Sequence, residues 1–264
     1  MLKVSSYNSN STSFKAIPIS QWKCISVAKN KPANIVITQL EKRDAEFINN
    51  FRCNWLLHPE SKDSTRNSIV ETALGIIEAA LSTDMQALDK VKMFFALHNK
   101  KPCGVLIGNL PKKDASTGGI NYSSRHNCAK KEGEIDWLAT WTPKGEEEIK
   151  GTGKALVGEY FGSLNQDRLK DVFVKSELPE FSVAQSFYES LGFETLGKKR
   201  TRIITNTSRE YVLSSIIDPD DRVIPMIITE SKIQNCFKEL SQKMSRKEYL
   251  QVSLPTEDLI NIDY

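Results

Sequence analysis

The chain has 264 residues, a length that fits one or two domains. Hydrophobic residues make up 39% and charged residues 26%, so the collagen-like, mucin-like and wholly disordered classes are excluded. The net charge of +3 comes from 36 basic and 33 acidic residues, and this near balance does not call for a nucleic-acid partner. Apolar runs such as Met93–Leu97 are much shorter than the ~20 residues of a membrane span, so no transmembrane helix is predicted.

Cysteine and histidine are dispersed along the chain. The five cysteines are odd in number and none of them forms a C-x-x-C pair, which argues against a disulfide framework and against a zinc site. Three scattered histidines add no metal-binding pattern, so no metal is predicted. The start of the chain has no apolar region of the ~7–15 residues that a signal peptide needs. We therefore expect a reducing, cytoplasmic compartment.

The first half of the chain begins with a Ser- and Asn-rich segment, residues 1–15, that we expect to be disordered. Secreted bacterial effectors often begin in this way, and so do ordinary frayed termini, so both interpretations stay open. Apolar spacing then predicts, in chain order, a strand at 35–40, helices at 41–57 and 70–81, and a hairpin formed by 91–98 and 102–110. Residues 111–132 have no periodicity; their basic side chains fit either a loop that selects an acidic partner or a solvated insertion.

The second half alternates strands and helices. In chain order it predicts a strand at 133–141, a helix from Gly151 to about Leu164, a strand at 171–176, a helix at 182–191, strands at 193–204 and 209–216, a strand-like VIPMIIT segment and a helix near 233–244. We expect an N-terminal extension at 1–33, a main domain at 34–216 and a C-terminal appendage at 217–264.

The most informative feature is the glycine-rich turn that opens the helix at Gly151. Gly151 and Gly153 let the backbone approach a ligand closely, and the first N–H groups of a helix have no intrahelical partners. With Lys150 and Lys154 beside them, these groups would form an anion site suited to a pyrophosphate. A plain tight turn is the alternative. A P-loop is excluded because Ala155 follows Lys154, and the dinucleotide fingerprint lacks its third glycine.

A second motif, Ala184–Phe193 (AQSFYESLGF), follows after one predicted strand. The two motifs in this order resemble those of the GNAT superfamily of acetyl-coenzyme A-dependent N-acetyltransferases, and the resemblance covers about residues 34–216. It implies an α/β (α+β) fold with a mixed, mostly antiparallel central sheet flanked by helices. It also implies an enzyme that moves an acetyl group from acetyl-CoA directly to an amine acceptor, here unidentified, either a protein or a small molecule.

The resemblance further implies where coenzyme A binds. The family's pyrophosphate loop maps onto Glu148–Gly153, and the strand before it contacts the pantetheine arm through its backbone. The implied cofactor-binding residues are Leu138, Ala139, Thr140, Lys150, Gly151, Thr152, Gly153, Lys154 and Ala155.

The resemblance also implies an acid and a base. Tyr188 stands where family members carry the tyrosine that protonates the departing thiolate, although core packing alone would also explain a tyrosine there. Glu134 stands where histone-type members carry the general base; the alternative is that it is simply a carboxylate exposed to solvent.

Strict alternation of side chains along the predicted strand places Asp136 on the same side as Glu134, and Trp137 and Trp141 on the opposite side. No Cys/His pairing supports a thiol mechanism at Cys103 or Cys128.

Two positions depart from the family pattern. Glu148 replaces the usual Arg or Gln of the pyrophosphate loop, and the acidic run Glu146–Glu148 should repel a pyrophosphate unless nearby lysines compensate. Phe181 replaces an asparagine that is frequent before the second motif. These departures motivate an alternative function, a non-catalytic coenzyme A-binding or regulatory protein on the same scaffold.

Overall fold

A computed structural model describes residues 14–16, 18–39, 91–109, 133–143, 145–164, 171–177, 183–195, 203–206, 209–212, 223–249 and 260–262. Several segments discussed above lie outside these residues: the first thirteen residues, the two helices predicted at 41–57 and 70–81, and the loop 111–132. In the described part of the chain, no helix is long and apolar enough to cross a membrane.

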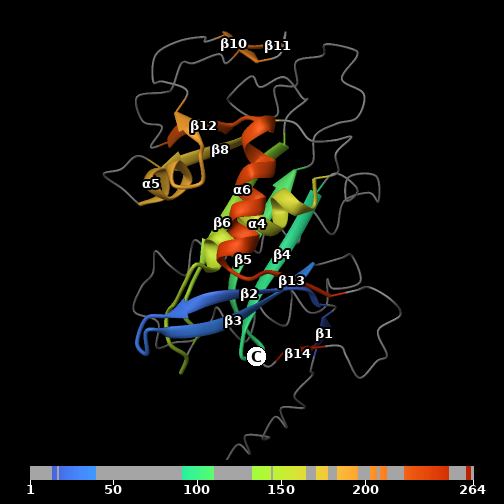
Figure 1. Ribbon diagram of the computed structural model, residues 1–264, viewed down its shortest axis with the longest axis vertical. Coiled ribbons are helices and arrows are strands. Elements are labelled where there is room, and N and C mark those ends of the chain that lie inside the picture. Colours follow the sequence, from blue (N-terminus) through green and yellow to red (C-terminus); the bar gives the residue numbers. More distant parts are fainter. Residues whose placement is uncertain are drawn as a thin grey trace, which may run out of the picture.

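The centre of the molecule is one large, mixed sheet with the order β13-β2-β3-β4-β5-β6-β8-β12-β9, and a short β7 pairs with β2 (Figure 1). Among the described strand pairs of this sheet, only β6 and β8 run parallel. The mixed, mostly antiparallel sheet expected from the sequence is therefore confirmed. The strands are β1 (Phe14–Ala16), β2 (Pro18–Ser26), β3 (Lys31–Gln39), β4 (Val91–His98), β5 (Lys101–Asn109), β6 (Gly133–Thr140), β7 (Ile149–Lys150), β8 (Val172–Glu177), β9 (Glu194–Thr195), β10 (Ile203–Asn206), β11 (Arg209–Val212), β12 (Val223–Ile228), β13 (Lys247–Glu248) and β14 (Ile260–Ile262).

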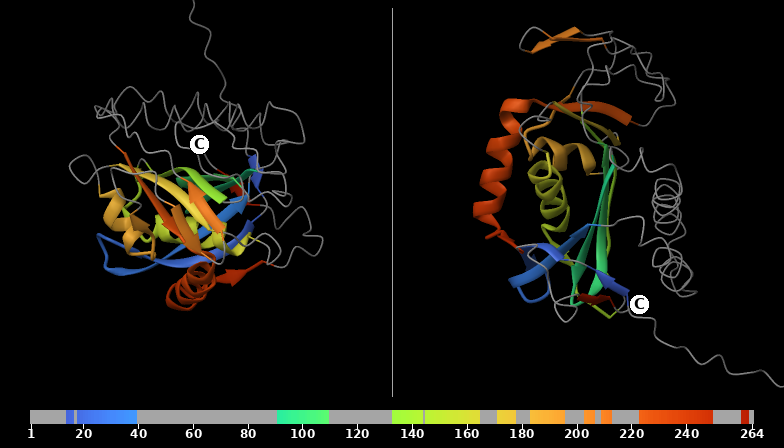
Figure 2. Two further views of the ribbon diagram at one scale, coloured as in Figure 1. Left: turned by 90° about the horizontal axis from the view of Figure 1, so that it is seen from above. Right: turned by 90° about the vertical axis from the view of Figure 1, so that its right-hand side faces the viewer.

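The described helices are α4 (Thr152–Gly162), α5 (Ala184–Glu189) and α6 (Glu230–Lys243). They lie on one side of the sheet, with α4 next to the strands and α6 outside it (Figures 1 and 2). One continuous core joins α4 to the sheet, because Ala155, Leu156 and Tyr160 on α4 are completely buried against it. The periodicity of these apolar residues is what predicted the helix.

The hairpin predicted in the first half is confirmed as β4 and β5. Its two turn residues, Asn99 and Lys100, both have positive φ, at 49° and 66°. This is the backbone of a type I′ turn, whose twist matches that of the two strands it joins.

Both ends of the chain contribute to the central sheet. Strand β2 lies inside the segment expected to be an N-terminal extension, and its Trp22 is completely buried. Strand β12 comes from the expected C-terminal appendage and pairs with β8 over six residues. The alternation of apolar and polar residues along the sequence did not indicate that β2 belongs to the central sheet, because polar Ser, Gln and Lys residues stand between its apolar ones.

The closing strands differ from the expected pair at 193–204 and 209–216. The first of these segments gives only the short β9 in the central sheet, and β10 pairs with β11 as a separate two-stranded sheet. Strand β12 occupies the place between β8 and β9. A further two-stranded sheet joins β1 to β14.

Candidate active site

The sheet opens between β6 and β8. These parallel strands pair over only three positions, from Gly133 with Val172 to Ile135 with Val174. Beyond that point β6 continues to Thr140 along β5, whereas β8 continues to Glu177 along β12. No strand in the described residues pairs with the other edge of β6 after Ile135. Within the part of the chain that the structure describes, strand pairing therefore does not use the backbone groups of this edge from Trp137 to Thr140.

A β-bulge lies where the opening begins. Ile107 pairs with Trp137 and Gly108 pairs with Ile135, so Asp136 is an extra residue in β6. The bulge shifts the alternation of side chains, and the strict alternation assumed from the sequence is wrong beyond this point. Bulges of this kind re-aim side chains and are frequent beside active sites.

The bulge fixes which side chains share a face. Gly108 faces α4, because an added Cβ there would lie 2.5 Å from the Tyr160 ring. Its neighbour Asn109 therefore faces the other way, together with its direct partner Glu134. The Asn109 side-chain amide donates a hydrogen bond to Asp136, so Asp136 lies on this face as well.

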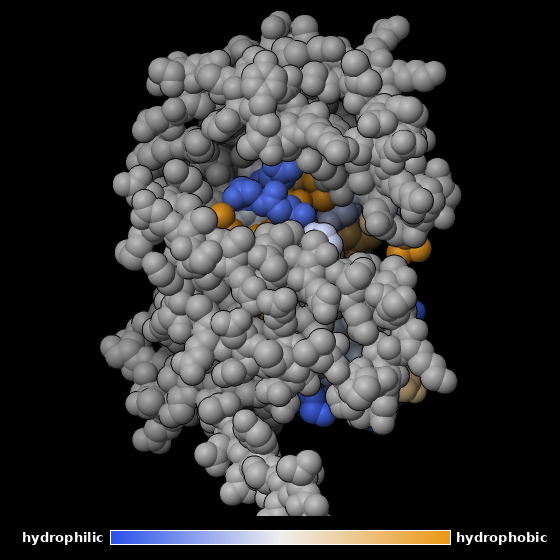
Figure 3. All heavy atoms as spheres, turned by 180° about the vertical axis from the view of Figure 1, so that it is seen from behind, coloured by the Kyte–Doolittle hydropathy of each residue, from blue (hydrophilic) through white to orange (hydrophobic). Residues whose placement is uncertain are grey.

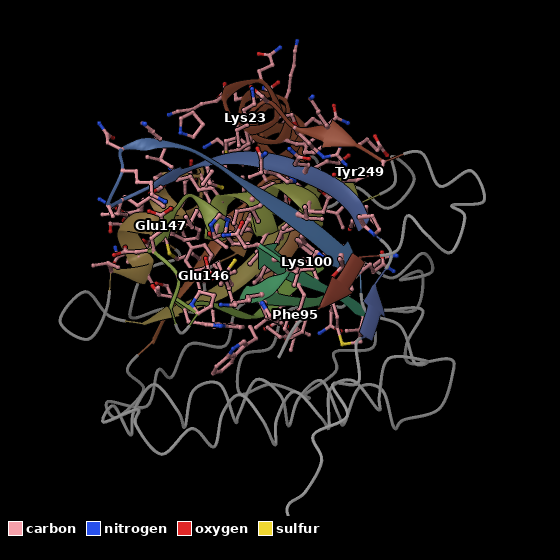
Figure 4. All side chains as sticks on the ribbon, turned by 90° about the horizontal axis from the view of Figure 1, so that it is seen from below. Lys23, Phe95, Lys100, Glu146, Glu147 and Tyr249 are labelled. Atoms are coloured by element: carbon pink, nitrogen blue, oxygen red, sulfur yellow. The ribbon has the colours of Figure 1, made fainter. Side chains whose placement is uncertain are left out.

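Tryptophan placement follows from the same register. Trp137 pairs with Ile107 and so lies on the face of Asp136, which corrects the opposite placement expected from the sequence. Trp141 packs edge-to-face on Phe95, with ring centroids 6.5 Å apart. Phe95 lies on the side of the sheet away from α6 (Figure 4). The two tryptophans thus line the face opposite α4.

The start of α4 has the geometry of an anion site. Gly151 is the N-cap with φ of 104°, a left-handed conformation that favours glycine, and no side chain caps the helix. The first helical bond runs from the Ala155 N–H to the Gly151 carbonyl oxygen, at 2.9 Å. Within the described residues, the N–H groups of Thr152, Gly153 and Lys154 have no backbone partner. They point along the positive end of the helix dipole.

Two lysines flank these N–H groups. Lys150 is exposed and Lys154 is half-buried, and neither pairs with a carboxylate in the part of the chain that the structure describes. Burial raises the pKa of the Cys236 thiol on α6 to about 11, and the positive charge of Lys154 opposes this rise. Because Lys154 on α4 acts on a thiol of α6, it lies where these two helices meet. Its ammonium group could pair with a bound anion there.

The other predicted coenzyme residues meet at the same place. A Cβ added to Gly153 would lie 3.3 Å from the Phe187 ring of α5 and 3.8 Å from the methyl group of Thr140. The end of β6, the start of α4 and the helix α5 therefore converge. Leu138 and Ala139, also predicted to contact the coenzyme, immediately precede Thr140 on the unpaired edge of β6.

Tyr188 lies beside this convergence, in the core on the α4 side of the sheet. Its side chain is 6% exposed, and its ring packs edge-to-face on Phe187 and Phe193, at centroid distances of 5.1 and 5.3 Å. Burial raises the pKa of the Tyr188 hydroxyl well above 10. Burial is the sole cause of this shift, and no hydrogen bond joins the hydroxyl to another described residue. Tyr188 is therefore a neutral proton donor over the whole physiological pH range.

Glu134 lies on the opposite face from Tyr188, at the end of β6 that is still paired with β8. Its neighbour in space is Tyr160, whose buried hydroxyl donates a hydrogen bond to the Asn109 carbonyl oxygen. The backbone of Glu134 hydrogen-bonds to the same hydroxyl. The predicted acid and the predicted base thus lie on opposite sides of the sheet.

Two of the three carboxylates in the acidic run before the loop form ion pairs. Glu146 forms an ion pair with Lys101 at 2.9 Å, and Glu147 forms one with Lys29 at 3.0 Å. Figure 4 shows Glu146 and Glu147 on the same side of the molecule. Hydrogen bonds from Lys101 and Asn99 lower the pKa of Glu146, and hydrogen bonds from Ser26 and Lys29 lower that of Glu147. Both groups therefore present little uncompensated charge to the start of α4.

The thiols in the core have no nucleophilic character. Burial raises the pKa of Cys24 and of Cys103 to about 12, so both are neutral at physiological pH. No group of three metal-binding side chains occurs among the described residues. Cys128 lies outside them.

Sequence reasoning missed the bulge at Asp136 and its supports, Asn109 and Tyr160. Two glycines were a usable signal, since a Cβ on Gly108 or Gly133 would lie 2.5 or 2.7 Å from Tyr160. Glycines on neighbouring strands often mark the close approach of a large side chain. The contact of Phe187 with Gly153 had no signal in the local sequence.

One of three comparisons with known proteins found similar proteins, and these are solved structures that include acetyltransferases. No protein-family model matches the chain, and no curated protein matches it either. Among solved structures, Mycobacterium smegmatis RimJ in complex with CoA-disulfide is 12% identical over 88% of this chain and 98% of its own, with a TM-score of 0.44. The Vibrio cholerae spermidine N-acetyltransferase with CoA and spermine is 18% identical over 76% and 98%, with a TM-score of 0.38.

A third match is the Escherichia coli ribosomal-protein-S18-alanine N-acetyltransferase, 15% identical over 74% of this chain and 93% of its own, with a TM-score of 0.41. With identities below 20% and TM-scores below 0.5, these three matches assign neither activity nor acceptor to this chain.

Proposed function

We propose that the protein is an N-acetyltransferase that moves an acetyl group directly from acetyl-CoA to an amine. The observation that carries this proposal is the opening between β6 and β8, which lies beside the uncapped start of α4. The opening offers backbone hydrogen bonds to an extended arm, and the helix start offers three N–H groups to a pyrophosphate.

The proposal places coenzyme A in one orientation. Its pyrophosphate would bind the N–H groups of Thr152, Gly153 and Lys154, with Lys150 and Lys154 as counter-charges. Its pantetheine arm would follow the unpaired edge of β6 at Leu138–Thr140, which leads toward the bulge. The thioester would then lie within the opening, between the two faces of the sheet.

Tyr188 has the properties of the acid in this reaction. When the amine nitrogen attacks the thioester carbonyl carbon, the carbon–sulfur bond breaks and the sulfur needs a proton. Burial raises the pKa of Tyr188, which keeps the hydroxyl protonated and makes it a weaker acid than a free phenol, and the hydroxyl makes no hydrogen bond to a described residue. It lies in the core on the side from which the coenzyme would enter.

The amine would approach from the opposite face, where carboxylates line β6. The surplus proton of the amine must go to a base on that face, and Glu134 is the base predicted from the sequence. Separate positions for the acid and the base suit direct transfer, because one proton leaves the amine nitrogen and another reaches the sulfur, and these are two different atoms of the tetrahedral intermediate.

The second candidate is a non-catalytic protein that binds coenzyme A. Glu148 is the observation that favours it, because no ion pair with Glu148 occurs among the described residues. The ion pairs of Glu146 and Glu147 weaken this alternative, since two of the three carboxylates in the acidic run are paired.

Release of the free thiol of coenzyme A distinguishes the two candidates. The purified protein is incubated with acetyl-CoA and, separately, spermidine, a lysine-containing peptide and a peptide with a free N-terminal alanine. The acetyltransferase predicts amine-dependent thiol release and a product heavier by one acetyl group. Binding of acetyl-CoA with no transfer to any of these amines would favour the non-catalytic candidate.

A further inference from the structure

We propose that Asp136 is the catalytic residue that takes the amine proton, and that Asn109 and Tyr160 are the residues that position it. This inference rests on the proposed acetyl transfer and names the group that serves it on the acceptor face.

The bulge presents Asp136 at the mouth of the opening. Asp136 is the first residue of β6 beyond the last position paired with β8, and it is exposed. Figure 3 views the molecule from the side of the sheet away from α4, and among the described residues it shows hydrophilic and hydrophobic residues next to one another near the middle of the view. An acceptor that reaches the opening from this face would pass the Asp136 carboxylate.

The Asp136 carboxylate is held in place by a neighbouring strand. The side-chain amide of Asn109 donates a hydrogen bond to its Oδ2 atom. This bond spans from β5 to the bulge, so it fixes both the carboxylate and the extra residue that carries it. A group that must meet a substrate in one geometry gains from such a fixed partner.

Tyr160 supports this arrangement from the other side of the sheet. Its completely buried hydroxyl donates to the Asn109 carbonyl oxygen and is hydrogen-bonded by the backbone of Glu134, the residue that pairs with Asn109. The hydroxyl thereby joins β5 to β6 next to the bulge. Only glycine at 108 and 133 leaves room for the Tyr160 side chain, because a Cβ would lie 2.5 or 2.7 Å from it.

Glu134 is less suited to the same role. It lies where β6 is paired with β5 on one side and β8 on the other, and it is half-buried, whereas Asp136 is exposed beyond the pairing with β8. Glu134 on its own strand and Tyr160 on α4 are among the titratable groups near Asp136. A second negative charge beside Asp136 would favour a cationic acceptor.

The proposed step transfers one acetyl group and moves protons at the nitrogen and at the sulfur. A protonated amine gives one proton to the Asp136 carboxylate, directly or through water, and its nitrogen lone pair attacks the thioester carbonyl carbon. The carbon–sulfur bond breaks, and the sulfur takes a proton from Tyr188. The second nitrogen proton restores Tyr188 through solvent, and Asp136 releases its proton to water because it is exposed.

The test compares amide variants of the two carboxylates. Asp136→Asn and Glu134→Gln are assayed with acetyl-CoA and the amine of the three-member panel that the wild type uses best, with Glu194→Gln on β9 as an exposed control. We expect Asp136→Asn to lower kcat at least about 100-fold at pH 7.5 with an unchanged KM for acetyl-CoA. Glu134→Gln and Glu194→Gln should change kcat less than about threefold.

A pH profile separates a base from a structural residue. Near pH 10 about a third of a lysine-type amine is already neutral, so the loss in Asp136→Asn should shrink to less than about 10-fold. Asp136→Glu should recover part of the activity.

The positioning role of Asn109 has its own test. Asn109→Ala should lower kcat about 10-fold with an unchanged KM for acetyl-CoA, because the Asp136 carboxylate is still present but is no longer held by a hydrogen bond. Melting curves check that each variant is folded, and Asp136→Ser replaces any Asp136→Asn protein that is not.

The kinetics of these variants decide whether Asp136 is the base. A large loss in Glu134→Gln with a nearly unchanged Asp136→Asn overturns the assignment and leaves the acetyltransferase standing. Equal losses in both variants that do not shrink toward pH 10 also overturn it, because they indicate a structural role. If the wild type acetylates none of the three amines, the proposed function fails, and the assignment fails with it.

Discussion

At the scale of single residues, Tyr188 combines a buried ring with a hydroxyl that bonds to no described residue. Replacing it by phenylalanine keeps the packing on Phe187 and Phe193 and removes only the proton donor. We expect Tyr188→Phe to lower kcat about 100-fold and to leave the Kd for acetyl-CoA within about twofold. Steady-state kinetics and calorimetry measure the two effects, and a large loss of coenzyme affinity would contradict the role of acid.

The pKa of Tyr188 adds a prediction on pH. Because burial raises this pKa above 10, the acid stays protonated as the pH rises to about 10. The rate of the wild type should therefore show no decline between pH 8 and pH 10. A decline with an apparent pKa near 9 that disappears in Tyr188→Phe would contradict this account.

Two further residues, Glu146 and Glu147, link pH to stability. Their pKa values are lower in the folded chain than the ordinary ~4.3, so their ion pairs stabilise the fold above that pH. This contribution is lost as the pH falls from about 5 through the lowered pKa values. The effect is small, since Lys29 is largely exposed.

Melting temperatures between pH 3 and pH 6 measure this contribution. We expect the combined variant Glu146→Gln, Glu147→Gln to melt lower than the wild type at pH 6 and to lose less stability on acidification. A control with Glu239→Gln on α6 should follow the wild type. Parallel curves for the wild type and the combined variant would show that these carboxylates do not contribute.

At the scale of elements, one buried network holds the two ends of the chain on α4. The carboxylate of Glu159, 5% exposed, accepts hydrogen bonds from Ser20 and Trp22 on β2 and from Arg246 after α6, the closest from Arg246 being 2.9 Å. The Arg246 guanidinium also stacks near the rings of Trp22 and Phe237. The buried Glu159 carboxylate on α4 thus has hydrogen-bond partners from two other segments, β2 and the residue Arg246 after α6.

A double-mutant cycle tests the network. Glu159→Leu leaves the guanidinium of Arg246 without its main partner and should cost about 3–5 kcal/mol of unfolding free energy. The double variant Glu159→Leu, Arg246→Met should be at least about 1 kcal/mol more stable than the sum of the single effects. Urea unfolding supplies the three values. Simple additivity would mean that the two side chains act independently.

Elements with strong local patterns were predictable. The hairpin β4–β5, the strand β6, the helices α4 and α5 and the helix α6 all lie close to their predicted bounds. Their apolar spacing or glycine-marked ends arise from local geometry, which the sequence carries directly. The position of β12 between β8 and β9 depends on contacts far apart in the chain, and no local pattern reports such contacts.

The candidate site was predictable to a similar degree. Glycine spacing indicated the start of α4, and the second motif indicated Tyr188. The face of Asp136 and Trp137 was not predictable, because one inserted residue reverses the alternation and leaves no mark in composition. Pairing register, which requires the partner strand β5, decides it.

At the scale of the whole molecule, the fold extends beyond the segment 34–216 that the resemblance covers. Strands β2 and β12 lie inside the central sheet, and α6 covers α4. We expect a fragment of residues 34–216 to be unfolded or aggregated, because it lacks the completely buried Trp22 and Met226. Circular dichroism and gel filtration of the fragment beside the full chain test this. A fragment that melts cooperatively would show an independent domain.

The central claim is that coenzyme A binds at the start of α4, and its most direct test is the melting temperature with acetyl-CoA. At ~100 times its Kd the coenzyme should stabilise the protein by ~2.7 kcal/mol, which raises the melting temperature by about 5–10 °C. Gly153→Ala should keep this shift, and Gly153→Glu, which places a carboxylate among the free N–H groups, should abolish it while remaining folded. An absent shift in the wild type at millimolar acetyl-CoA, or an equal shift in Gly153→Glu, would contradict the account.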